Sequence, residues 1–272
     1  MTLHHCCGRD TPLKSKRFKG DIMKRVWIVG GSSGIGLELV KLYLKNDCKV
    51  IVSSRSASKN DELCELKDHY NTSLQLLDLD VSQETSMDNI VKLAWNTYDG
   101  IDIWLYNAGA YETMKLDAWD IKHFEKMMQT NYLGAVKLID LLTPLFEAQG
   151  SGRWAFNASL SSYFGLPYGG AYSAPKAALV NLIESIQPEL IIRNIQAQII
   201  NHGFVKTRLT QKNDFDMPQL MTPETAAKNI YKGLNAPYQF EMRFPYKLAW
   251  FLRLIRFLPY RFSLAMTKRM LR

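Results

Sequence analysis

The sequence predicts an α/β fold in which about seven parallel strands form one doubly wound sheet flanked by helices. Two observations carry this prediction: short apolar runs alternate with helical patterns along the chain, and a glycine-rich turn follows the first run. Strands that alternate with helices favour a parallel sheet with right-handed crossovers. The strand-like runs lie at residues 26–30, 49–53, 73–77, 101–106, 153–158 and 195–200, with 239–243 as a seventh.

The composition fits one large domain with an extension at each end. With 272 residues, of which 47% are hydrophobic and 22% charged, the chain can bury a full core. We expect a single domain over residues 23–245 and a basic, apolar helical tail over residues 246–272. Residues 1–22 contain no apolar stretch of signal-peptide length. We expect them to be a disordered extension or an upstream mis-start, with Met23 as the true first residue.

The cysteines show no disulfide framework, and we expect reduced thiols at Cys48, Cys64 and the adjacent pair Cys6-Cys7. The run His4-His5-Cys6-Cys7 places potential ligands side by side. A closed tetrahedral metal site needs wider ligand spacing. We therefore expect no metal.

A glycine-rich turn stands between the first strand and the first predicted helix, which extends to about Asn46. A turn with few side chains lets a pyrophosphate approach the backbone and rest at a helix N-terminus. A tight turn that binds no ligand is the alternative. The candidate cofactor-binding residues of this turn are Gly30, Ser32, Ser33, Gly34, Ile35 and Gly36.

Arg55 stands where a dinucleotide-binding fold recognises the adenosine ribose, directly after the second strand and nineteen residues after Gly36. An acidic residue there would bind the ribose hydroxyls, whereas an arginine that follows two serines suits a 2′-phosphate. This residue therefore favours NADP(H) over NAD(H). The alternative is a solvated surface arginine.

Tyr172 and Lys176 form the most informative pair of residues in the chain. Because they are four residues apart, they project from one face if the segment is helical. A nearby ammonium favours the phenolate, and this matters because the ordinary tyrosine pKa is about 10, whereas a proton donor at neutral pH should titrate closer to 7. Ser159 precedes Tyr172 by thirteen residues. The set predicts redox chemistry with an acid–base tyrosine.

With these motifs in this order, the chain resembles the classical short-chain dehydrogenase/reductase family from about Lys24 to Thr207. Asp80-Val81 is similar to the family's adenine-contacting dipeptide, and Asn107-Ala108-Gly109 is similar to its central-strand motif. The resemblance implies a Rossmann fold, a cytoplasmic oxidoreductase that transfers a hydride, and a homodimer or homotetramer. With Asn131, the residues already named complete a match to the family's catalytic tetrad, which is Asn131, Ser159, Tyr172 and Lys176.

The resemblance also implies a role for each member of the tetrad. Tyr172 is the general acid/base that protonates the carbonyl oxygen during reduction, and Ser159 polarises that oxygen. Lys176 holds the nicotinamide ribose hydroxyls and lowers the tyrosine pKa, while Asn131 positions a water that links the lysine to solvent. Considered one at a time, each of these residues also has an explanation without catalysis, such as a serine in a loop or a polar asparagine inside a helix.

The chain departs from the family pattern after the sixth predicted strand. Where the family usually has Pro-Gly, this chain has His202-Gly203. Loss of the proline removes a fixed φ, which would loosen the loop unless His202 itself reaches the site as an extra polar group. An incidental histidine is the alternative. By resemblance, Thr207 contacts the nicotinamide side of the cofactor.

The segment 246–272 contains seven basic residues and no acidic one. Subtracting these seven from the formal net charge of +8 leaves +1, so the charge does not indicate nucleic-acid binding. In helical projection Arg253, Arg256 and Tyr260 share a narrow face, and apolar residues spread around the other side. This pattern predicts a peripheral helix on the anionic cytoplasmic face of a membrane rather than a span. Packing on the chain's own substrate cleft, or an oligomer contact, are the alternatives.

A polar loop over residues 211–221 and an apolar segment over residues 163–168 are the expected walls of the substrate site. We predict an apolar pocket for a hydrophobic ketone, aldehyde or secondary alcohol. The function predicted is an NADP(H)-dependent oxidoreductase that interconverts a carbonyl and an alcohol. The alternative is a membrane-associated NADP(H)-binding sensor or scaffold without turnover, which the intact pair of Tyr172 and Lys176 disfavours.

Overall fold

A computed structural model of the protein describes residues 23–83, 85 and 87–271. The expectations for residues 1–22, which include the histidine and cysteine run, lie outside the described residues. Cys48 and Cys64 are free thiols. Among the described residues, no helix has the length and apolar character needed to cross a membrane.

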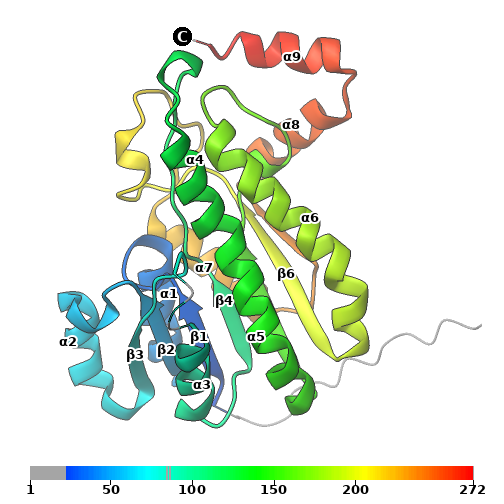
Figure 1. Ribbon diagram of the computed structural model, residues 1–272. Helices are drawn as coiled ribbons and strands as arrows, with labels where there is room; N and C mark the ends of the chain where they lie inside the picture. The colour runs from blue at the N-terminus through cyan, green and yellow to red at the C-terminus, as the bar shows by residue number, and fades with distance from the viewer. Residues whose placement is uncertain (1–22, 84, 86, 272) are drawn as a thin grey trace, which may run out of the picture.

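The core of the protein is a seven-stranded sheet in the order β3-β2-β1-β4-β5-β6-β7 (Figure 1). All neighbouring strands pair in parallel. The predicted doubly wound parallel sheet is therefore confirmed, with the reversal of strand order between β1 and β4. The strands are β1 Arg25–Val29, β2 Lys49–Ser54, β3 Leu74–Asp78, β4 Ile103–Tyr106, β5 Gly152–Asn157, β6 Ile195–His202 and β7 Glu241–Phe244.

Helices cover both faces of the sheet, because successive strand residues point to opposite sides. In β1, Val26 and Ile28 enter the core formed with α1, α2 and α7, while Trp27 and Val29 enter the core formed with α3, α5 and α6. Both sides are thus buried, which explains the nearly continuous apolar runs. The domain helices are α1 Gly34–Lys45, α2 Asp61–Tyr70, α3 Met87–Thr97, α4 Ile121–Met128, α5 Gly134–Gln149, α6 Gly170–Ile192 and α7 Pro223–Asn235.

Short helical turns connect several of these elements. A π-helical turn at Gln129–Leu133 joins α4 to α5, so that the two form one long rod along the sheet (Figure 1). The 3-10 turns lie at Ala57–Lys59, Asn71–Ser73, Leu116–Ala118, Leu160–Ser162 and Thr210–Lys212.

The C-terminal tail forms two helices, α8 Tyr246–Phe257 and α9 Tyr260–Lys268, where the sequence analysis expected one interfacial helix. Pro259 explains the break, because it disfavours helical geometry in the residue before it, and Leu258 is extended. The expected division into one basic and one apolar side is also wrong in part. One apolar face of α8 packs on the domain, against Leu160 and its neighbours.

Candidate active site

The glycine turn lies between the end of β1 and the start of α1, and two of its glycines cannot be replaced without a clash. A Cβ at Gly30 would lie 2.5 Å from the Ala108 nitrogen, and a Cβ at Gly36 would lie 2.1 Å from the Gly30 oxygen. Ser33 is the N-cap of α1 but provides no side-chain cap, and the first turn contains no acidic residue. The N–H groups at this helix end are therefore available to an anion.

Asn107 fastens this turn to the sheet. Its side-chain amide donates to the Gly30 carbonyl oxygen at 2.6 Å, and its oxygen accepts from the Asn157 amide at 2.7 Å. Asn157 in turn belongs to β5 and accepts a hydrogen bond from Lys176 through its main chain at 2.5 Å. A continuous polar chain thus joins the predicted cofactor turn to the predicted catalytic lysine.

The far end of the predicted cofactor site lies at the ends of β2 and β3. Arg55 follows β2 directly and is exposed. No described residue forms a hydrogen bond or an ion pair with its guanidinium. Asp80 accepts hydrogen bonds from the main chain and hydroxyl of Ser82 at 2.9 and 2.7 Å, and Val81 is buried beside it. Among the described residues, the Arg55 guanidinium is therefore an unpaired cation, at the position where the sequence predicts a 2′-phosphate.

Tyr172 and Lys176 lie one turn apart near the start of α6, as predicted. The lysine side chain is only 3% exposed, and its Nζ lies 6.0 Å from the centroid of the tyrosine ring. Burial lowers the pKa of Lys176 to about 7. Burial also raises the pKa of Tyr172 to about 12, although a hydrogen bond with Ser159 opposes this rise. The implied depression of the tyrosine pKa by the lysine is thus not seen in this structure, where burial of the phenol dominates.

Ser159 lies at the N-terminus of the 3-10 turn that follows β5, and it is 8% exposed. Its hydroxyl oxygen accepts hydrogen bonds from the Ser161 main chain at 3.2 Å and from the Ser161 hydroxyl at 3.0 Å. Ser159 also interacts with Tyr172, whose pKa its side chain lowers. Of the nearby serines, Ser159 is therefore the one joined to the tyrosine.

Asn131 sits inside the π-helical turn and is fully buried. Its side chain forms two hydrogen bonds with the main chain of Ala110. It accepts one from the Ala110 nitrogen at 2.8 Å and donates one to the Ala110 oxygen at 2.9 Å. A Cβ at Gly109 would lie 3.4 Å from the Asn131 oxygen and 3.9 Å from the Lys176 Nζ. The glycine therefore keeps the space between asparagine and lysine clear, and π-helical turns are frequent at functional sites.

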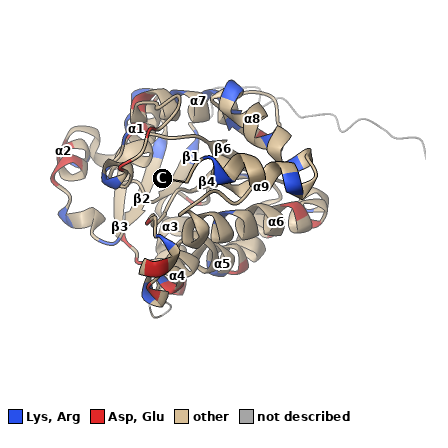
Figure 2. Ribbon diagram, turned by 90° about the horizontal axis from the view of Figure 1, so that it is seen from above, with Lys and Arg blue, Asp and Glu red and all other residues tan. Residues whose placement is uncertain are grey.

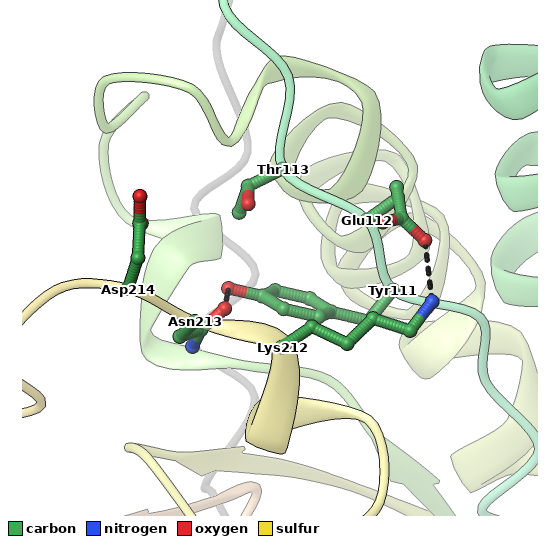
Figure 3. A pocket seen from close by; sticks show the side chains of 6 residues that line it. All are labelled: Tyr111, Glu112, Thr113, Lys212, Asn213 and Asp214. Atoms are coloured by element: carbon green, nitrogen blue, oxygen red, sulfur yellow. Dashed lines mark hydrogen bonds and ion pairs between the residues drawn. The ribbon is translucent and has the colours of Figure 1, made fainter.

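Tyr111 is a site residue that the sequence analysis missed. Its ring packs edge-on against Tyr172, with 4.8 Å between centroids, and its hydroxyl donates to the Asn213 side chain at 3.0 Å (Figure 3). A second link, Lys212 to Glu112 at 2.9 Å, joins the same two segments. Its only sequence signal is a position two residues after the Asn107-Ala108-Gly109 motif.

The cavity at these two segments has a volume of about 240 Å³ and a polar lining. The predicted polar loop forms one wall, but the predicted apolar wall at residues 163–168 does not line it. Tyr163, Phe164 and Leu166 pack against α8 instead. The lining residues are Tyr111, Glu112, Thr113, Lys212, Asn213 and Asp214 (Figure 3).

A carboxylate network holds α8 beside the predicted catalytic serine. The Tyr163 hydroxyl donates to Glu241, which also accepts from Asn201 at 2.8 Å and Arg243 at 3.1 Å. Arg253 of α8 lies 3.6 Å from the same carboxylate. The inner face of α8 thus packs on the chain's own domain.

His202, the last residue of β6, and Thr207, in the chain that follows it, border the site. The His202 ring stacks on Phe244, and its Nδ1 donates to the Gly203 carbonyl oxygen at 2.7 Å. Burial lowers the pKa of His202 to about 4, and the positive Lys176 adds to this effect, so the ring is neutral at pH 7. Thr207 lies against the glycine turn, since a Cβ at Gly34 would be 3.1 Å from its methyl group.

These residues together fit a bound nicotinamide dinucleotide. The uncapped start of α1 and the bare glycine turn suit a pyrophosphate. Arg55 supplies an unpaired cation at one end of this line of residues, and Tyr172 with Lys176 stands at the other.

The chain matches the family model of short chain dehydrogenases over residues 24–217. An uncharacterized oxidoreductase of Staphylococcus haemolyticus is 30% identical over 210 residues, which are 77% of this chain and 90% of that protein. A protein of Nostoc sp. named ketoacyl reductase HetN is 26% identical over 216 residues, 78% of this chain and 75% of its own. This chain therefore belongs to the short-chain dehydrogenase/reductase family of oxidoreductases.

Solved structures agree with this assignment. A short-chain dehydrogenase from Streptomyces avermitilis superposes with a TM-score of 0.78 at 21% identity and covers 92% of this chain and 98% of its own, which shows the fold. The structure of ElxO with NADP bound has a TM-score of 0.73 at 25% identity over 82% of this chain and 97% of its own. A nicotinamide dinucleotide is thus the cofactor class of the family members that resemble this chain.

Proposed function

We propose that the protein is an NADP(H)-dependent oxidoreductase that interconverts a carbonyl and an alcohol on a hydrophobic substrate. The observation that carries the proposal is that Ser159 and Tyr172 interact through their side chains, with Lys176 buried one turn further along α6. A hydroxyl pair of this kind can hold and protonate one substrate oxygen.

Each residue of the tetrad has a defined task in the proposal. Ser159 donates a hydrogen bond to the carbonyl oxygen, and Tyr172 delivers the proton to that oxygen during reduction. Lys176 holds the ribose hydroxyls at the nicotinamide end, and Asn131 positions a water that connects the lysine with solvent. The cofactor supplies the hydride to the carbonyl carbon. The protein contributes orientation and the proton donor.

The direction of the reaction in the cell depends on the ratio of the reduced to the oxidised cofactor, and the proposed preference for NADPH favours reduction. Because burial raises the pKa of Tyr172 to about 12, the phenol carries its proton throughout the neutral range. A protonated tyrosine is the form that reduction consumes, whereas oxidation of an alcohol requires the phenolate. This agrees with a preference for NADPH, the reduced cofactor that Arg55 favours.

Arg55 supports NADP(H) as the particular cofactor, because its exposed guanidinium can bind a 2′-phosphate with charge-assisted hydrogen bonds. The remaining contacts proposed for the dinucleotide come from the glycine turn and the ends of the neighbouring strands. They are Gly30, Ser32, Ser33, Gly34, Ile35, Gly36, Asp80, Val81, Asn107, Ala108, Gly109 and Thr207.

We also propose that residues 246–272 bind the protein peripherally to the cytoplasmic face of an anionic membrane. The protein is further proposed to assemble as a homodimer or homotetramer. The absence of acidic residues from this segment supports the membrane contact. A sensor that binds NADP(H) without turnover remains the competing function. The contact between Tyr172 and Ser159 favours the enzyme, because ligand sensing alone does not require a proton donor there.

The test is the decrease in NADPH absorbance with purified full-length protein and a panel of ketones and aldehydes graded by chain length. Turnover that rises with chain length and exceeds turnover with NADH is the expected result. NADPH binding without turnover across the whole panel, lipid carbonyls included, would establish the sensor instead. Faster turnover of small polar carbonyls would contradict the hydrophobic substrate.

A further inference from the structure

We propose that the outward side of α8 and α9 docks on an anionic lipid bilayer and turns the active-site end of the molecule toward it. In this orientation the substrate is an amphiphile taken from the lipid. The inference rests on the proposed function for the substrate, but the docking itself is argued from the tail alone. The C-terminal face denotes here the exposed side chains of residues 246–271.

The first observation is that α8 is apolar on two opposite faces. Ala249, Leu252 and Ile255 are buried against the domain. At helical spacing, the opposite side carries Trp250, Leu254 and Phe257, which are 55%, 56% and 75% exposed. The domain therefore accounts for only one of the two apolar faces.

This exposure is concentrated in the tail. Of the twenty large hydrophobic side chains that are exposed in the described part of the chain, ten belong to the C-terminal face. Single exposed apolar residues are ordinary, but a set concentrated in one segment in this way is typical of an interaction surface. The set includes Tyr246, Trp250 and Tyr260, and such amphipathic rings favour the depth of lipid headgroups.

The charges of the C-terminal face indicate that its binding partner is an anionic surface. Figure 2 shows basic residues on α8 and α9, and the segment contains no acidic residue. Arg253 forms an ion pair with Glu241 of the domain, and Arg256 donates a hydrogen bond to the main-chain oxygen of Tyr163 at 3.2 Å. Lys247 and Lys268 are exposed, and no described residue pairs with them. Free cations beside an apolar stripe match anionic headgroups above an acyl layer.

A second copy of the chain fits this face less well. A two-fold dimer would place the same patch against itself. Lys247, Arg256, Arg261 and Lys268 would then face the same cations of the other copy, and residues 246–271 offer no carboxylate to compensate them. Like charges brought together in this way oppose association.

The position of the tail connects docking with catalysis. In Figure 1, α8 and α9 lie at the end of the molecule where the parallel strands end, and the site residues lie at that same end. A groove of about 370 Å³ separates α9 from residues 165–167, which lead into the helix that carries Tyr172. Leu166, Pro167, Leu264 and Leu271 give it apolar walls, and Lys268 stands among them. This is suitable lining for a hydrocarbon chain with an anionic or polar head.

The experiment measures sedimentation of the full-length protein with phosphatidylcholine vesicles that contain or lack phosphatidylglycerol. We expect binding only to the anionic vesicles. The variant W250S/L254S/F257S should lower the partition coefficient at least about a hundredfold, and K247Q/K268Q about twentyfold. The matched control L93S/I191S/I192S changes three exposed apolar residues of α3 and α6 and should bind as the unchanged protein does.

Turnover separates this inference from the proposed function. With a short, water-soluble carbonyl, W250S/L254S/F257S should be as active as the unchanged protein, while turnover of a long-chain carbonyl presented in anionic vesicles should fall with the loss of binding. Vesicle binding without any turnover would contradict the proposed function and leave the docking face standing.

Three results would overturn the docking face. They are undiminished vesicle binding by W250S/L254S/F257S, equal binding to vesicles with and without anionic lipid, and a concentration-dependent dimer in light scattering that the same variant abolishes. The last result would assign the face to a second copy. Because the substituted side chains are exposed, a melting temperature like that of the control variant should confirm that folding is intact.

Discussion

Lys176 directs its ammonium to the main-chain oxygen of Asn157 at 2.5 Å and keeps it 6.0 Å from the centroid of the Tyr172 ring. The lysine is therefore anchored to the sheet rather than to the phenol. Because burial lowers the pKa of Lys176 to about 7, its charge varies within the physiological range. Protonation of Lys176 therefore makes the charge within the site depend on the pH of the solution.

The stability of the protein should report this lowered pKa directly. The ordinary lysine pKa is 10.5, so between pH 7 and 10.5 the unfolded chain binds the proton more strongly than the folded chain. Stability from this group therefore rises with pH in that window. The free energy of unfolding of the unchanged protein, minus that of Lys176→Met, should increase by roughly 2 kcal/mol from pH 7 to 9. Urea denaturation checks this, and a difference that is flat or falls with pH contradicts it.

Arg55→Asp should reverse the preference between the two nicotinamide cofactors. The substitution removes a cation from the expected 2′-phosphate site and introduces a carboxylate that repels phosphate and can bind ribose hydroxyls. We expect the ratio of kcat/KM for NADPH over NADH to fall at least about tenfold, because one hydrogen bond to a charged group contributes about 1.5–3 kcal/mol. Arg208→Asp changes another arginine of the chain and serves as a charge control. An unchanged ratio in Arg55→Asp would reject the assigned role.

Gly36→Ala should damage both folding and cofactor binding. The new Cβ would lie 2.1 Å from the Gly30 oxygen, a main-chain atom that cannot move aside without opening the turn. A loss of stability of at least about 2 kcal/mol is expected. Gly165→Ala is the control, because no atom lies within 4 Å of the Cβ that it adds. Equal melting temperatures for the two variants would show that the turn is not packed as described.

Tyr111→Phe should weaken substrate binding more than it slows the chemical step. The variant keeps the ring against Tyr172 but loses the hydrogen bond to Asn213, so the loop that carries Asn213 is held less firmly. We expect KM to rise by about 3- to 10-fold, with kcat changed less, since one such bond contributes about 0.5–1.5 kcal/mol. Faster proteolytic cleavage within residues 210–217 should accompany it. A selective fall in kcat would instead assign the Tyr111 hydroxyl to catalysis.

The sheet was predictable from the sequence because its strands are buried on both faces, which leaves continuous apolar runs such as residues 49–53. The positions of Tyr172 and Lys176 on one helix were likewise predictable, since spacing alone decides them. The observed ends of the strands differ from the predicted ends by one or two residues. For example, β4 begins at Ile103 rather than at residue 101.

The remaining features depend on contacts between distant segments. Tyr111 reaches Tyr172 across sixty residues of chain, and no local pattern indicates this. The tail was predicted as a single amphipathic helix because its two apolar faces look like one broad face in projection. Only the packing of Leu252 and Ile255 on the domain separates the inner face from the outer one. The raised pKa of Tyr172 also required the structure, since sequence spacing gives the lysine's proximity but not the burial of the phenol that raises its pKa.

The central claim is that Tyr172 is the proton donor of a carbonyl–alcohol oxidoreductase. Its most direct test is NADPH consumption by Tyr172→Phe with the best carbonyl of the panel, with NADPH affinity measured by fluorescence in the same preparation. The account predicts an affinity close to that of the unchanged protein and turnover lower by at least about a hundredfold. Turnover that survives in this variant, with the cofactor bound normally, would contradict the account.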